Sequence, residues 1–184
     1  MAVALRWGVA LTVDDLDDVP EDGHRYELVD GMLLVTPAPG AGHQTCSAVL
    51  TALLLAAAGP DDLVLAAPFD YVTGTQTLFQ PDLLVAARAD VGTQRLERTP
   101  RLIVEIQSPS TRLTDLTLKR AAYEAAGVEA YWLVDPTKPE LTVLRLVDGV
   151  YVEAARVVGD EAYVGDFPFA LTVVPSTLLR GLTP

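Results

Sequence analysis

Two Asp-Gly pairs define the local geometry of this chain, because each one stands between two apolar segments. Asp30-Gly31 lies within "RYELVDGMLLV" and Asp148-Gly149 lies within "LTVLRLVDGVYVEAARV". Asp-Gly tolerates the positive φ angles of a two-residue hairpin turn, and the flanking residues favour strands. The sequence therefore predicts two β-hairpins, one near each end of the chain.

Two longer segments have helical patterns. Residues 43–59 are rich in alanine and leucine and predict a largely buried helix, in which His43 is a polar residue at the helix start or lies near the groove of the candidate site. Residues 110–127 predict an amphipathic helix that stops at Gly127. The apolar positions of this second helix at near-helical spacing are Leu113, Leu116, Ala122 and Tyr123.

Strands are expected over 63–72, with a proline interruption, and over 81–87, 101–107 and 130–135. Tyr131 and Trp132 alternate on the last of these, so one is expected in the core and the other at a surface. The order of elements predicts an α/β (α+β) fold with a central mixed sheet, flanking helices and added hairpins. Strand 102–107, helix 113–126 and strand 130–134 are expected to form one right-handed crossover unit. The whole chain, 1–184, is interpreted as one domain.

Composition excludes several kinds of protein. Of the 184 residues, 50% are apolar, which predicts a packed core, and the formal net charge of -12 argues against broad attraction to nucleic acid or anionic membranes. The single cysteine, Cys46, excludes an internal disulfide and a cysteine zinc cluster, and its apolar helical surroundings place it in the core. Without a recognisable secretory signal or membrane span, a cytoplasmic protein is expected.

Four polar residues stand in apolar surroundings. Asp82 opens the strand "PDLLVAA", Glu105 and Gln107 lie two apart in "RLIVEIQ", and Lys119 lies on the helix that follows. A lone buried carboxylate costs several kcal/mol unless it is paired. If the two strands are neighbours, Asp82 and Glu105 converge on a divalent cation such as Mg²⁺, which uses few protein carboxylates and bridges to phosphate.

These residues also carry a resemblance. The array "PDLLV", "LIVEIQSPST" and "D…K…Y…GV…YWLVDP", preceded by "RYELVDGMLLV" and "HQTCSAVLTALL", resembles the Uma-two family of restriction endonucleases within the PD-(D/E)XK nuclease superfamily. The bare PD…ExK pattern is short and widely spaced, but the full array is far more specific. The resemblance covers roughly residues 12–146.

The resemblance implies a role for each motif residue. Asp82 and Glu105 would be metal ligands, and the backbone carbonyl of Ile106 a third ligand. Glu27 matches an acidic residue that many superfamily members supply from an upstream element. Gln107 stands where the simple pattern has lysine; it joins the candidate catalytic set as a hydrogen-bonding residue or is an ordinary polar strand residue. Lys119, on the following helix, becomes the candidate catalytic lysine.

Each candidate also has a purely structural interpretation. Asp82 could be a turn residue that binds local amides. Glu105 could form a buried ion pair with Lys119, and Lys119 could be a surface partner of Asp115, four residues earlier on the helix. Glu27 could lie on the solvent face of a hairpin strand.

The resulting expectation is a metal-dependent endonuclease that hydrolyses phosphodiester bonds in DNA with Mg²⁺ or Mn²⁺ and works as a homodimer. Lys119 would steady the attacking water or the developing charge. The alternatives are a nuclease-fold binding or regulatory module without activity, and an oligomeric interaction protein, for which the second hairpin would suit strand-mediated association. The acidic net charge and Gln107 favour the inactive module.

Overall fold

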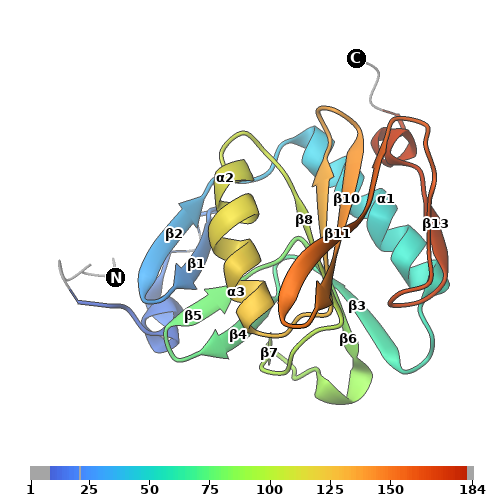
Figure 1. Cartoon of the computed structure of the whole chain (residues 1–184). Helices are drawn as coiled ribbons and strands as arrows, with labels where there is room; N and C mark the ends of the chain where they lie inside the picture. Colours follow the sequence, from blue (N-terminus) through green and yellow to red (C-terminus); the bar gives the residue numbers. More distant parts are fainter. Residues whose placement is uncertain (1–8, 21, 182–184) are drawn as a thin grey trace.

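The computed structural model describes residues 9–20 and 22–181, and shows a mixed α+β protein with two main sheets (Figure 1). The N-terminal residues, in which no secretory signal was recognised, fall mostly outside the described part. Among the helices of the described residues, none is long and apolar enough to cross a membrane. The predicted fold class is confirmed.

A six-stranded sheet forms the centre of the molecule. In spatial order its strands are β11 (Val150–Val158), β10 (Glu140–Val147), β9 (Ala130–Asp135), β8 (Leu102–Ile106), β6 (Leu83–Ala87) and β3 (Asp62–Ala66). All neighbours are antiparallel except β8 and β9, which are parallel and joined by a helical crossover. The predicted strand–helix–strand unit is therefore present, and the sheet is mixed.

A second sheet of five short strands packs beside the first. Its strands in spatial order are β2 (Met32–Thr36), β1 (Arg25–Val29), β5 (Thr77–Phe79), β4 (Asp70–Gly74) and β7 (Arg95–Leu96). The strand predicted over 63–72 is in fact two strands: β3 belongs to the central sheet and β4 to this one, with Pro68 between them. A periodicity argument could not detect this change of sheet, because both halves are apolar.

Both predicted hairpins form where the Asp-Gly pairs are. The β1–β2 turn has Asp30 at φ 48° and Gly31 at φ 77°, and the β10–β11 turn has Asp148 at φ 51° and Gly149 at φ 80°. Positive φ at both turn residues is the geometry that Asp-Gly favours. A small sheet of β12 (Tyr163–Gly165) and β13 (Leu171–Val173) follows the second hairpin.

Helix α1 (Ala41–Ala57) covers one face of the central sheet. Its buried side chains are Cys46, Leu50 and Leu54, so Cys46 is a core residue as predicted. The prediction of a largely buried helix is wrong in extent, since only one stripe is enclosed and Leu55 is exposed. The remaining short helices are 3-10 helices: η1 (Val13–Asp18), η2 (Arg88–Asp90) and η4 (Pro175–Leu179). Of these, η4 contacts α1, and η1 packs against the five-stranded sheet through Val13.

The opposite face of the central sheet is covered by the five-stranded sheet and by a helix that runs continuously through α2 (Arg112–Thr114), the π-helical turn η3 (Asp115–Lys119) and α3 (Arg120–Ala125). We call this element the crossover helix. Its predicted apolar face is wrong in the first half of the helix, where Leu113 is 75% exposed and Leu116 is also exposed, and right in the second half, where Tyr123 is buried and Ala122 packs against the core. The buried face carries Asp115 and Lys119 ahead of Tyr123.

Tyr131 and Trp132 are both fully buried, which corrects the expectation that one of them reaches a surface. Trp132 points into the core beneath α1, and Tyr131 points into the core beneath the crossover helix. Alternation along a strand assigns residues to opposite faces, but both faces of this central strand are covered.

Candidate active site

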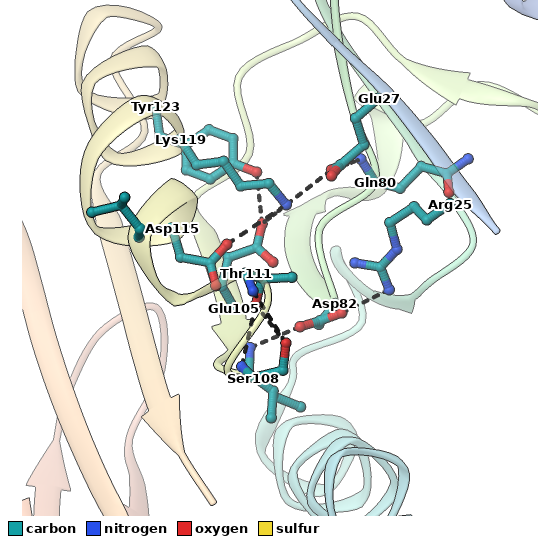
Figure 2. Close-up of polar contacts among 12 residues, drawn as sticks. Arg25, Glu27, Gln80, Asp82, Glu105, Ser108, Thr111, Asp115, Lys119 and Tyr123 are labelled. Carbon is teal, nitrogen blue, oxygen red and sulfur yellow. Dashed lines mark hydrogen bonds and ion pairs between the residues drawn. The ribbon is translucent and has the colours of Figure 1, made fainter. Parts of the chain in front are cut away.

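Three acidic side chains that are far apart in the sequence meet at one end of the central sheet (Figure 2). Glu27 lies on β1, Asp82 directly precedes β6, and Glu105 lies on β8. All three are buried, and together with Lys119 they line a pocket of about 180 Å³.

Strand pairing explains why Asp82 and Glu105 are neighbours. Leu83 on β6 is paired with Val104 on β8 in an antiparallel register. Continuing that register by one residue places Asp82 opposite Glu105, and opposite residues of an antiparallel pair point to the same face. The Ile106 N–H donates to Asp82 Oδ2 at 2.7 Å, which ties the two strand ends together. The predicted adjacency of these two strands is present.

Lys119 lies between the carboxylates. Its Nζ is 2.9 Å from Glu27 Oε1 and 3.0 Å from Glu105 Oε1, and 4.0 Å from Asp115 Oδ1 (Figure 2). Tyr123, one turn further along the crossover helix, donates its hydroxyl to Glu105 Oε1 at 2.8 Å. Lys119 is therefore not a surface partner of Asp115, since its side chain is enclosed among three carboxylates.

The helix places this lysine because its sequence repeats polar residues every four positions. Asp115, Lys119 and Tyr123 follow one another at i, i+4 and i+8, which puts them on one face. The π-helical turn spans Asp115–Lys119, and Lys119 at its end lines the pocket. Such turns are rare and are found often at functional sites.

Asp82 is held by donors on both of its oxygens. Arg25 Nη2 donates to Oδ1 at 2.8 Å, and His43 Nε2 lies 2.9 Å from Oδ2. Burial by itself would raise the pKa of Asp82, but the His43 hydrogen bond and the Arg25 charge outweigh it and lower the pKa to about 2. Asp82 is thus ionised. Because an ionised carboxylate can only accept hydrogen bonds, the donor in the contact with His43 is the Nε2–H of the imidazole.

Glu105 behaves in the opposite way. Burial raises its pKa to about 8, with the Lys119 charge opposing the rise and the Asp82 charge adding to it. Burial also raises the pKa of Asp115, to about 6, and Lys119 again opposes the rise. The neighbouring carboxylates outweigh burial at Lys119 and raise its pKa, so the ammonium stays charged. One lysine cannot neutralise all the surrounding carboxylates, and a proton on Glu105 relieves the excess.

The remaining predicted residues take different positions. Glu27 lies in the pocket rather than on a solvent face, and its Oε1 also accepts the Gln80 N–H at 2.9 Å. Gln107 is buried and donates its N–H to Val134 O at 2.7 Å, but it does not line the pocket. The structure thus brings Glu27, Asp82, Glu105 and Lys119 together and leaves Gln107 beside them.

Sequence reasoning missed Arg25 and Tyr123 as members of this site and left the position of His43 open. Arg25 could have been found, because it lies two residues before Glu27 on the same strand and so shares its face. Tyr123 was assigned to an apolar face, although its spacing from Lys119 was already informative. Of the two positions considered for His43, the structure shows the one near the groove, since its Nε2 lies 2.9 Å from Asp82 Oδ2. Its buried Nδ1 has no hydrogen-bond partner within the described part of the chain.

The fold is shared with a crystallised protein from Anabaena variabilis, described as "a putative nuclease belonging to DUF820". The match has a TM-score of 0.74 at 20% sequence identity and covers 92% of this chain and 97% of that one. At this level of identity, the likeness establishes a common fold.

A family model named Uma2, with the description "Putative restriction endonuclease", matches residues 13–173. The chain therefore belongs to this family. The resemblance seen in the motifs is confirmed, and it extends past Leu146 to the end of β13. The comparison with curated proteins found no match.

Proposed function

We propose that this protein is a metal-dependent nuclease of the PD-(D/E)XK type that hydrolyses phosphodiester bonds in DNA. The observation that carries the proposal is the convergence of four side chains on one pocket: Glu27 from β1, Asp82 from the residue before β6, Glu105 from β8 and Lys119 from the crossover helix. Membership of a family described as restriction endonucleases supports the same reaction.

The side chains fit a hard divalent cation by their chemistry. Asp82 and Glu105 are neighbouring oxygen donors, and Oε2 of Glu105 accepts no hydrogen bond from the described residues, because Lys119 and Tyr123 both bind Oε1. The N–H and carbonyl of a strand residue point the same way, so the carbonyl of Ile106 is directed toward Asp82, as its N–H is. This geometry supports Ile106 as a third ligand.

No group of three or more His, Cys, Asp or Glu residues suited to hold a metal is found within residues 9–20 and 22–181. Mg²⁺ does not require such a group, since it keeps several waters and binds through one or two carboxylates. When bound, such a cation lowers the pKa of a coordinated water and stabilises charge on a phosphate oxygen. Asp82 and Glu105 are the residues that would hold it.

The other residues position and compensate charge. Lys119 is fixed by Glu27 and Glu105, so its ammonium points into the pocket, where it would orient the attacking water or stabilise the negative charge that develops on the phosphate. Tyr123 fixes the orientation of Glu105 through Oε1. Gln107 supports the strand end through its backbone.

One observation favours a second candidate, a nuclease-fold binding module without activity. Lys119, the residue that replaces the lysine expected at Gln107, is paired with two carboxylates. The net charge of -12 also disfavours contact with many DNA phosphates. The two candidates differ in whether a metal-loaded protein cleaves DNA.

The decisive experiment is a calorimetric titration of Mn²⁺ into the wild type, Glu105→Gln and a matched surface control, Glu153→Gln, with folding checked by circular dichroism. Glu153 is paired with Arg156 away from the pocket. We expect the wild type and the control to bind Mn²⁺ and Glu105→Gln to bind it at least tenfold more weakly, because the amide cannot become the anionic ligand that Glu105 becomes when a metal displaces its proton. Equal binding by all three proteins would exclude the proposed metal site.

A cleavage assay on labelled duplex and single-stranded DNA with Mg²⁺ then separates the two candidates. Cleavage that EDTA abolishes and Glu105→Gln lacks supports the nuclease. Metal binding without cleavage of either DNA supports the binding module.

A further inference from the structure

Arg25 occupies a special position among the charged residues of the pocket. It lies on β1 two residues before Glu27, and its guanidinium makes one hydrogen bond to the described residues, from Nη2 to Asp82 Oδ1. The side chain is 18% exposed, whereas Lys119 is 3% exposed and fixed between two carboxylates. Arg25 is therefore the permanently charged basic side chain of this pocket with donors still available to a ligand.

We propose that Arg25 binds the phosphate of the DNA substrate, and that it leaves Asp82 for this phosphate when a divalent cation takes Asp82. The inference rests on the proposed function and adds to it a substrate-binding residue. It follows from the position of Arg25, the balance of charge in the pocket and the shape of the surrounding groove.

The balance of charge favours the exchange. In the described structure, the four carboxylates Glu27, Asp82, Glu105 and Asp115 lie around two permanent cations, Arg25 and Lys119. A divalent cation bound at Asp82 would supply the positive charge that Arg25 now supplies there. The Arg25 guanidinium would then be free to pair with the single negative charge of a phosphodiester.

The groove continues past Arg25 on the side away from Lys119. A second hollow of about 280 Å³ shares Arg25, His43 and Asp82 with the first pocket. It extends to Gln44 and Ser47 on α1, whose side chains are uncharged. A DNA strand lying along both hollows would pass its phosphate backbone over Arg25, where the two hollows meet.

Arginine suits this role. Its planar guanidinium presents five N–H donors and binds phosphate oxygens in pairs. A protein with a net charge of -12 has few basic residues to contribute, so the loss of one phosphate contact should be easy to measure.

The test compares wild type, Arg25→Gln, Arg25→Lys and a matched control, Arg156→Gln, all checked for folding by circular dichroism. Arg156 is a surface arginine paired with Glu140 and Glu153. Two binding measurements are made: Mn²⁺ by calorimetry without DNA, and fluorescein-labelled DNA by fluorescence anisotropy with Ca²⁺, over a series of salt concentrations.

Loss of Arg25 should weaken DNA binding without weakening Mn²⁺ binding. Arg25→Gln is expected to bind DNA about tenfold more weakly, with a salt slope reduced by about 1. It should bind Mn²⁺ as tightly as the wild type or more tightly, because Asp82 loses a competing cation. Arg25→Lys, which keeps the charge, should retain more DNA affinity than Arg25→Gln and serves as the informative variant if Arg25→Gln does not fold. Arg156→Gln should match the wild type in both measurements.

Two results would overturn the proposal while leaving the proposed function intact. In one, folded Arg25→Gln, or folded Arg25→Lys if the glutamine variant does not fold, binds DNA as tightly as wild type. In the other, that variant loses Mn²⁺ affinity, which would mean that Arg25 holds Asp82 in place for the metal. A wild type that binds neither Mn²⁺ nor DNA would overturn both proposals together.

Discussion

The two long helices bury stripes with the same spacing and opposite chemistry. Each stripe has a residue at i, i+4 and i+8, and each faces the central sheet from one side. The buried stripes are Cys46, Leu50 and Leu54 on α1 and Asp115, Lys119 and Tyr123 on the crossover helix.

The difference shows that stability alone does not orient the crossover helix. Burying leucine is favourable without any partner, while burying an ammonium or a carboxylate is costly unless each is paired. The crossover helix nevertheless leaves Leu113, Leu116 and Leu118 exposed and encloses Lys119. The polar stripe instead completes the charge cluster of Glu27 and Glu105.

The largest effect is expected from Lys119→Met, which removes the charged member of the polar stripe. Glu27 and Glu105 would remain buried without a counter-charge, and we expect a loss of about 3–5 kcal/mol in the free energy of unfolding. Urea denaturation measures this loss. A change below about 1 kcal/mol would show that the charges are not enclosed in solution.

The matched control on the apolar stripe is Leu50→Ala, for which a cavity is expected to cost about 2–5 kcal/mol. Adding Glu27→Gln and Glu105→Gln should recover part of the stability lost in Lys119→Met and none of that lost in Leu50→Ala. Equal responses of the two variants would mean that the stripes do not differ as described.

The change of stability with pH should be smaller than the effect of Lys119→Met and larger than that of a surface substitution. It should come from Asp115 in the polar stripe and from Glu105, which pairs with Lys119. Glu105 has an ordinary pKa of 4.5 and a folded pKa of about 8, so in this window the folded state holds a proton that the unfolded chain has released. The free energy of unfolding therefore falls as the pH rises from about 4.5 to about 8. Asp115, with a folded pKa of about 6, contributes in the same direction.

Thermal unfolding at pH 4.5, 6 and 8 measures this slope. Glu105→Gln should flatten it, while Leu50→Ala should lower stability and keep the slope. Asp82 acts at the acid end: its folded pKa of about 2 lies below the ordinary 3.8, so its contribution is present above about pH 3.8 and is lost as the pH falls toward 2. An unchanged slope in Glu105→Gln would contradict the protonation of that residue.

The smallest effect is expected from Leu113→Gln on the outer face of the crossover helix. With the leucine side chain 75% exposed, the stability should change by no more than about 0.5 kcal/mol. Urea denaturation and sedimentation of both proteins measure the effect. A larger loss, with a change in sedimentation, would show that a second copy covers this face, as the expected homodimer would allow.

The edge strand β11 is poorly suited to pair with a strand of another chain. The backbone of Tyr151 on this outer strand binds the side chains of Glu124 and Arg120 from the crossover helix. Glu153 and Arg156 place charges further along the strand. Such features protect an edge from pairing with another chain, so the hairpin is less suited to strand-mediated association than its sequence alone indicates.

Much of the fold was predictable because it depends on local chemistry. The two Asp-Gly turns and the parallel pair around the crossover helix follow from φ preferences and from the order of apolar segments. The wrong expectations concern Leu113, Trp132 and the segment 63–72. In each case, burial depends on which other helix or sheet packs against that side of the segment. The residue pattern within one segment does not contain this information.

By itself, the sequence determined the elements, the two turns and the family, and it singled out Asp82, Glu105 and Lys119 as polar residues in apolar surroundings. All three side chains are buried. A charged residue within an apolar segment is therefore a strong indication of a paired or functional site, because uncompensated charge is costly inside a protein. Only the tertiary structure decided how the charges are compensated. Arg25 and His43 reach Asp82 across 57 and 39 residues of chain, and Lys119 joins Glu27 to Glu105 because two sheets and a helix meet there. Electrostatic pairing depends on distance in space, which separation along the chain does not reveal.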